Sequence, residues 1–169
     1  STATGVWANV SETGGNTAAF TTDPLNVTTY YRVFVSAIEN GCEDVYSALV
    51  TVTVYDDILI TTLSPGGSIC ESGTWNLSVT ASGSPNLVYQ WQDSTAAGVW
   101  ANVSETGGNT TSFTTDPLTV TTYYRVFVSA TEPGCEDVYS AIVPVIVLDD
   151  IAITALAPNG SICESGTWN

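Results

Sequence analysis

The chain contains an internal duplication. Residues 1–76 align with residues 94–169 at a constant offset of 93, and 62 of the 76 aligned positions carry the same residue. A match of this length at one spacing indicates tandem copies of one folding unit. A period of 93 residues is too long for a solenoid repeat, which spans about 20 to 50 residues, but it suits an independent β-sandwich of roughly 100 residues. Each period is therefore expected to form one domain.

The duplication also sets the expected domain boundaries, at the equivalent residues Asp57 and Asp150. They divide the chain into the C-terminal part of one repeat, a complete repeat and the N-terminal part of the next, at residues 1–56, 57–149 and 150–169. The two outer parts together still lack the equivalent of residues 77–93, which carries two central strands and a tryptophan. We therefore interpret the chain as a stretch of a longer array and not as a subunit that exchanges strands.

The complete repeat has the pattern of an all-β domain. Val, Ile, Thr and Tyr are abundant, turn residues recur every 8 to 15 residues, and no segment keeps an apolar period of 3.6 residues. Seven strands are expected, at residues 58–63, 74–81, 87–92, 98–103, 111–115, 122–130 and 138–148. This number of short strands in one repeat predicts tandem immunoglobulin-like (Ig-like) β-sandwich domains.

Aromatic residues support the Ig-like assignment. Trp91 lies on the third strand, where this fold buries a tryptophan, and Tyr123 and Tyr124 begin the sixth strand, where a tyrosine corner is common. Trp75 and Trp91 are expected in the core. Trp100 is the one tryptophan of the repeat that, if exposed, could stack on a sugar ring.

Charge excludes several functions. The net charge is −15, the only cationic side chains are Arg32 and Arg125, and the chain has no Lys and no His. Such a surface cannot neutralise a nucleic-acid backbone or bind an anionic membrane. The usual general base and Schiff-base amine are also missing, so we expect no catalytic residue and no required cofactor. No apolar run approaches the ~20 residues that a membrane-spanning helix needs, so no membrane insertion is expected.

Several short motifs follow one another in an order that resembles a known family. They are Tyr89-Gln-Trp-Gln, Val99-Trp-Ala-Asn-Val, Phe113-Thr-Thr, Thr121-Thr-Tyr-Tyr-Arg-Val and Gly134-Cys, followed by a Val-rich last strand. The series is similar to the Ig-like or PKD-like tandem repeats of very large Bacteroidota cell-surface proteins, and the similarity covers the whole chain. It implies export, often by the type IX system, and a role as an adhesin stalk or surface fibre without catalytic residues.

The four cysteines form two equivalent pairs, Cys42 with Cys135 and Cys70 with Cys163. Even, spaced cysteines in a chain of extracellular character favour disulfides over free thiols or a metal site. In an Ig-like sandwich, Cys70 and Cys135 lie in loops at opposite ends, and eight strand residues span ~26 Å, whereas bridged Cα atoms lie about 4.4–6.8 Å apart. We therefore favour a bond from Cys70 to the counterpart of Cys135 in the next repeat. A bond within one repeat and free thiols remain alternatives.

Four carboxylates are expected to gather at the junction where the complete repeat begins. They are Asp56, Asp57, Glu136 and Asp137. Oxygen ligands contributed by two domains can bind calcium and stiffen a linker, so calcium is a candidate ligand here. The alternative is ordinary solvation, because acidic surfaces resist association. One modification is also a candidate: Asp93-Ser94-Thr95 resembles an O-glycosylation motif of Bacteroidota, which would place a sugar on Ser94.

The sequence thus predicts a structural segment of an extracellular or cell-surface fibre or adhesin stalk, which provides reach and mechanical integrity. Its partners would be neighbouring identical repeats and other copies in a fibre. A second hypothesis is a module that binds a glycan or a host surface through Trp100 and the loop at residues 105–110. A third is an accessory domain of a secreted hydrolase.

Overall fold

The computed structural model describes residues 1–2, 5–39, 41–96, 98–155 and 160–167. All regular structure within these residues is β-strand. No helix that could cross a membrane was found in this part of the chain.

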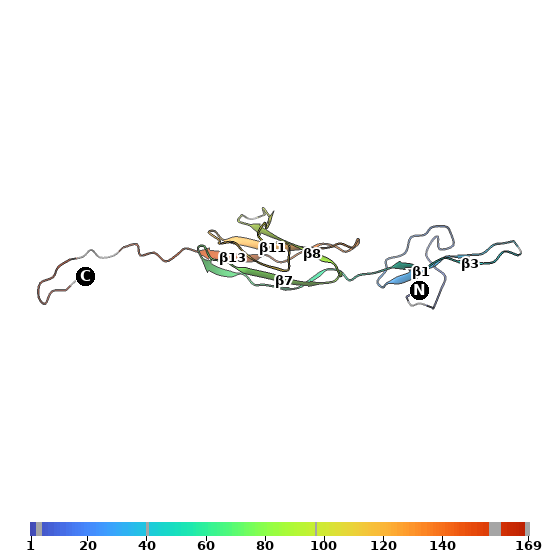
Figure 1. Ribbon diagram of the computed structural model, residues 1–169, viewed down its shortest axis with the longest axis horizontal. Helices are drawn as coiled ribbons and strands as arrows, with labels where there is room; N and C mark the ends of the chain where they lie inside the picture. The colour runs from blue at the N-terminus through green and yellow to red at the C-terminus, as the bar shows by residue number, and fades with distance from the viewer. Residues whose placement is uncertain (3–4, 40, 97, 156–159, 168–169) are drawn as a thin grey trace. The chain divides into compact units, whose positions relative to one another are not determined.

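The complete repeat contains two sheets that pack face to face (Figure 1). The first sheet has the order β10–β7–β5, with β5 at Leu59–Leu63, β7 at Asn76–Ser82 and β10 at Ser112–Thr114. The second has the order β6–β13–β11–β8–β9, with β6 at Gly67–Cys70, β8 at Leu87–Ser94, β9 at Ala101–Asn102, β11 at Thr122–Ala130 and β13 at Val143–Leu148. A further strand, β12 at Val138–Tyr139, pairs with β11. This arrangement confirms the all-β, Ig-like sandwich.

Alternating side chains of the strands fill the space between the sheets. Leu77 and Val79 of β7 face Val126 and Val128 of β11, and all four are at most 4% exposed. Apolar packing therefore stands where antibody domains have their inter-sheet disulfide. Trp91 is 0% exposed, as predicted.

Three aromatic rings extend this core. The centroid of Trp91 lies 5.5 Å from that of Phe113, whose ring meets Tyr124 edge-on at 5.9 Å. The Trp91 Nε1–H donates to the carbonyl oxygen of Thr110 at 3.0 Å, so its polar group is satisfied. Trp75, expected in the core, is only half-buried.

The sequence did not predict β6. Residues Ser64 to Gly67 were expected to be only a turn, but β6 begins at Gly67, joins the second sheet and pairs in parallel with β13. Glycine permits this close approach: a Cβ on Gly66 would overlap the carbonyl oxygen of Pro144, and one on Gly67 would overlap the Trp75 ring. The half-buried Trp75 thus covers the start of β6.

The last strand was predicted as one segment, but it is interrupted. Between β12 and β13, the hydroxyl of Ser140 accepts a hydrogen bond from the N–H of Val126 at 2.9 Å and donates to the carbonyl of Ala141 at 2.7 Å. The side chain thus replaces a backbone group of the ladder, as at a β-bulge. The predicted span was therefore right in extent but wrong in continuity.

The N-terminal copy contains two strand pairs. They are β1 at Thr29–Tyr31 with β4 at Val50–Val52, and β2 at Phe34–Val35 with β3 at Val45–Tyr46. Thr29 pairs with Val52 as Thr122 pairs with Val145, so this copy keeps the register of the complete repeat. Residues 150–155 and 160–167 form no strand.

Candidate functional site

Arg125 lies between two aromatic rings on the surface of the complete repeat. Its guanidinium carbon is 4.3 Å from the ring centroid of Trp100 and 4.2 Å from that of Tyr139. Both distances are within the ~6 Å over which a cation is attracted to a ring face. We call these three side chains the arginine stack.

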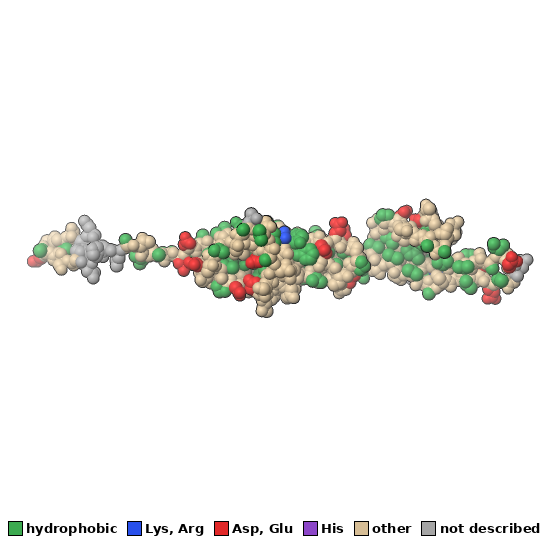
Figure 2. All heavy atoms as spheres, turned by 90° about the horizontal axis from the view of Figure 1, so that it is seen from above, with side chains coloured by type: hydrophobic (Ala, Val, Ile, Leu, Met, Phe, Trp, Pro, Cys, Tyr) green, Lys and Arg blue, Asp and Glu red, His purple; other side chains and the backbone are tan. Residues whose placement is uncertain are grey.

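Strand alternation explains the position of the stack. On β11 the neighbours Tyr124 and Val126 point into the core, so Arg125 points to the outer face of the sheet. Its Nε–H donates to Oε1 of Gln92 on β8 at 2.9 Å, which orients the guanidinium. Figure 2 shows an arginine side chain beside hydrophobic side chains on the surface of the complete repeat.

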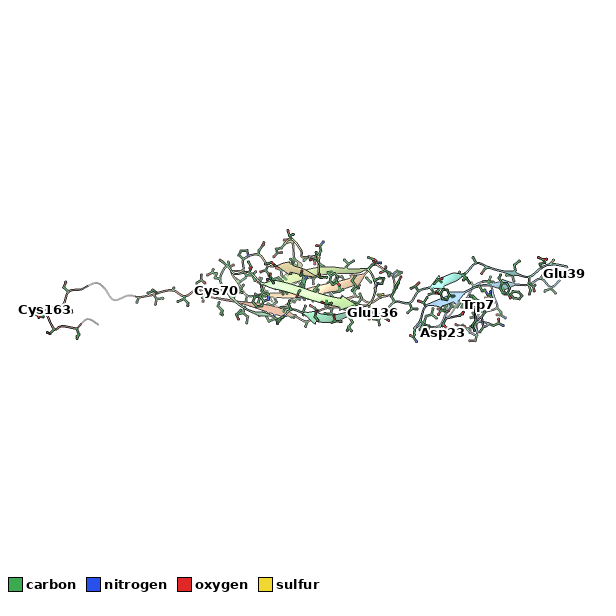
Figure 3. The ribbon with its side chains drawn as sticks, turned by 60° about the horizontal axis from the view of Figure 1, so that its bottom comes forward. Trp7, Asp23, Glu39, Cys70, Glu136 and Cys163 are labelled. Carbon is green, nitrogen blue, oxygen red and sulfur yellow. The ribbon has the colours of Figure 1, made fainter. Side chains whose placement is uncertain are left out.

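The N-terminal copy repeats the stack with nearly the same geometry. The guanidinium carbon of Arg32 lies 4.1 Å from the Trp7 centroid and 4.2 Å from that of Tyr46. Figure 3 labels Trp7 among the side chains of this copy. Arg32 and Arg125 are the only arginines of a chain that has no lysine. Each copy therefore uses its single cation in the same intramolecular contact.

This geometry changes the interpretation of Trp100. The side chain is half-buried, and the guanidinium of Arg125 covers one face of its ring. A sugar could stack only on a face that the arginine leaves open. Tyr139, which is 53% exposed and 5.0 Å from Phe127 between ring centroids, is the more accessible aromatic side chain of the stack.

The four cysteines are free thiols in the structure. Cys70 ends β6 beside Leu148, the last residue of β13 (Figure 3). Thr122, the first residue of β11, pairs with Val145 of β13, three residues before Leu148, so Cys70 lies beyond the beginning of β11. Cys135 follows the end of β11 and is partly buried.

The predicted junction carboxylates are all exposed: Asp56, Asp57, Glu136 and Asp137. Within the described residues, no three carboxylate or thiolate side chains lie together as a group that could hold a metal ion. The structure therefore gives no geometry for the calcium ion considered above.

Ser94 is 5% exposed, and its hydroxyl donates to the carbonyl of Ala96. The folded repeat therefore does not present this hydroxyl for the attachment of a sugar. The sequence motif could not show this, because burial depends on the packing of β8 in its sheet.

Sequence reasoning also missed a polar network at the turn between β7 and β8. Ser84 donates from Oγ to Oε2 of Glu132 at 2.8 Å, and the Asn86 side-chain amide donates to Oε1 of the same carboxylate. These bonds, that from Asn86 first, lower the pKa of Glu132. The network holds the loop that carries Cys135 against this turn.

Burial has the opposite effect on Tyr124, the expected tyrosine-corner residue. It raises the pKa of the phenol, and the carboxylates of Glu105, Asp93 and Asp116 raise it further. Tyr124 is 1% exposed and thus stays neutral within the core at physiological pH.

Comparison with protein families gives one match, described as a domain of unknown function (DUF8696), over residues 1–56 and 60–149. The chain belongs to this family. No curated protein matches the DUF8696 chain.

Solved structures similar to the DUF8696 chain contain Ig domains. A complex of titin and obscurin-like 1 Ig domains has 16% sequence identity and a TM-score of 0.45, with 59% of this chain and 100% of that chain covered. The Ig domains 1–5 of Sidekick-1 have 15% identity and a TM-score of 0.44. That match covers 73% of this chain and 26% of the Sidekick-1 chain.

Proposed function

We propose that the chain is a structural repeat segment of an extracellular fibre or adhesin stalk of the Bacteroidota type and that it has no enzymatic activity. The observation that carries the proposal is the repetition of structure as well as sequence. The two copies share the register of their last strands and the arginine stack. In a fibre or stalk, the length grows in proportion to the number of repeats. This requires that all copies fold alike.

The organisation into repeats at residues 1–56, 57–149 and 150–169 is part of this proposal. Two separate family matches, at residues 1–56 and 60–149, support it. Neighbouring repeats of the same chain and other copies in a fibre would then be its main partners, at the cell surface.

We propose further that disulfides join neighbouring repeats. The positions of Cys70 and Cys135 at opposite ends of β11 support this pairing, because Cys70 lies beyond the start of this strand and Cys135 follows its end. In this pairing, none of the four cysteines has its partner among the 169 residues. Mild oxidation of this chain, followed by mass mapping, should give no Cys70–Cys135 bond. Detection of that bond would refute the proposal.

The length of the isolated full-length protein tests the structural role. Electron micrographs of variants that lack one, two or three repeats should show rods that shorten by a constant increment. Variants with scrambled repeats of equal length serve as the control. A rod length that does not depend on repeat number would overturn the proposal.

A second candidate function is a glycan- or surface-binding module. The exposed Tyr139, whose ring contacts Arg125 as Trp100 does, favours it, because sugars stack on accessible aromatic faces. A glycan array should then show binding that Tyr139→Ala abolishes and that Tyr123→Ala, at a tyrosine outside the arginine stack, does not.

A junction stiffened by calcium is a separate candidate. It would show as a rise in melting temperature on addition of calcium. No change with calcium would leave only solvation as the role of these carboxylates.

A further inference from the structure

The arginine stack fixes the guanidinium of Arg125 in one orientation. The guanidinium carbon lies 4.3 and 4.2 Å from the ring centroids of Trp100 and Tyr139, and the Nε–H donates to Oε1 of Gln92 at 2.9 Å. Gln92 is itself oriented, because its amide nitrogen donates to Oδ1 of Asn102 at 3.0 Å. Two rings and a hydrogen-bonded amide therefore set the plane in which the remaining N–H groups of Arg125 lie.

The terminal nitrogens of this guanidinium, Nη1 and Nη2, have no acceptor among the described residues. They carry four of the five N–H donors of an arginine. Arg125 also forms no ion pair within this part of the chain, although the sequence has 17 acidic side chains. No side-chain nitrogen or oxygen of the described residues is buried without a hydrogen-bond partner, so both terminal nitrogens are accessible to solvent.

Donors fixed in this way match a carboxylate group. The planar fork of a guanidinium donates two parallel hydrogen bonds to the two oxygens of a carboxylate, and such charge-assisted pairs are stronger than neutral ones. Because the stack already orders the side chain of Arg125, less conformational entropy is lost when an anion binds. The stack is therefore organised for binding a carboxylate before one is present.

Tyr139 adds an aromatic surface beside these donors. Both of its ring contacts, Arg125 and Phe127, lie on the outer face of β11, and 53% of its own surface remains exposed. A pyranose ring can stack on an accessible aromatic side chain of this kind. A carboxylate attached to a pyranose would therefore contact both parts of the site.

The charge of the chain limits how acidic the ligand can be. A net charge of −15 opposes the approach of any anion, but at physiological ionic strength charges more than about 8 Å apart are largely screened from each other. One carboxylate in direct contact with Arg125 gains the full attraction of the guanidinium. A polyanion would place its other charges against an acidic surface, so the site suits a glycan with a single acidic sugar.

We propose that the arginine stack binds the carboxylate of an acidic sugar, a uronic or a sialic acid, with the pyranose ring against Tyr139. The inference rests on the glycan-binding candidate function given above and names its ligand class. The equivalent stack around Arg32 is then a second site of the same kind. An acidic peptide is a weaker candidate, because the carboxylate of Asp or Glu is carried on a flexible chain without a ring for Tyr139.

The test is a titration of the chain followed by NMR. Because the chain has only two arginines, the region of arginine Nε–H signals contains one signal from each stack. Sialyllactose and a disaccharide that ends in glucuronic acid are the two acidic probes, and lactose is the neutral control. Both signals should shift saturably with at least one acidic probe, with an affinity at least tenfold above that for lactose. The probe that binds more tightly identifies the source of the carboxylate.

A variant separates binding from stability. Gln92→Glu keeps an acceptor for the Nε–H of Arg125 but places a carboxylate beside the guanidinium, and the exposed amide of Asn102 can turn to donate to it. The melting temperature should therefore not fall. The affinity at the Arg125 stack should fall at least fivefold, whereas the Arg32 signal should respond as in the parent chain. Tyr123→Ala, outside the stack, should change neither response.

Four results would overturn the inference. They are the absence of a saturable shift with both acidic probes, an equal response to acetate, tighter binding of a glutamate-containing peptide, and an unchanged affinity in Gln92→Glu. Lactose that binds through Tyr139 as tightly as the acidic probes would also overturn it, but would leave the glycan-binding candidate standing. Rod lengths that fail to scale with repeat number would refute the structural role without affecting this titration.

Discussion

The carboxylate of Glu132 accepts a hydrogen bond from the hydroxyl of Ser84 at 2.8 Å, which ties the loop after β11 to the turn between β7 and β8. Ser84 is 4% exposed, so the bond also satisfies a buried hydroxyl. The loop that carries Cys135 therefore depends on the ionisation of one carboxylate.

Acid should weaken this attachment. The pKa of Glu132 is lower in the folded repeat than in the unfolded chain. The carboxylate therefore gives its full stabilisation at pH values above the pKa that it has in the unfolded chain. That stabilisation is lost as the pH falls through the folded pKa. Urea denaturation between pH 7 and pH 3 should show that Glu132→Gln flattens the acid decline in stability.

Glu136→Gln provides the matched control, because Glu136 is an exposed carboxylate in the same loop. This substitution should leave the loss of stability at low pH the same as in the parent protein. An equal effect of both substitutions would show that the decline reflects overall charge and not the bond to Ser84.

Removal of the arginine stack should destabilise the repeat without unfolding it. Arg125→Ala loses contacts with two ring faces and the bond to Gln92, and we expect a cost of about 1–2 kcal/mol. Arg125→Lys keeps the charge but loses the planar stack. It should therefore lower the free energy of unfolding, but by less than Arg125→Ala does. Chemical denaturation followed by tryptophan fluorescence measures both. Equal stability of Arg125→Ala and the parent protein would contradict a stabilising stack.

Replacement of the core tryptophan should lower the stability of the repeat far more than replacement of an exposed residue. Trp91→Ala should lower the free energy of unfolding by about 3–5 kcal/mol, because it leaves a large cavity beside Phe113 and an unpaired carbonyl at Thr110. Val99→Ala is the control, since Val99 is 71% exposed. A loss below ~1 kcal/mol for Trp91→Ala would show that the two sheets do not pack around this ring.

The sequence predicted most of the strands and the buried Trp91, because apolar residues alternate along the core strands. It could not predict β6, whose four residues show little alternation and pair with β13 more than 70 positions later. The arginine stack joins Trp100, which precedes β9, to Arg125 of β11 and Tyr139 of β12. In the sequence, the only sign of it is that both arginines occupy equivalent positions in the two copies. Ser94 shows the limit of a motif, because its burial depends on tertiary packing.

Stretching single molecules of the full-length protein tests the central claim, that these repeats are independently folded units of a fibre that carries load. We expect a series of unfolding events of similar force, measured under reducing conditions. Each event should release the length of one 93-residue repeat, which is about 310–330 Å when fully extended. A smooth extension at low force, or released lengths unrelated to the repeat, would contradict this account.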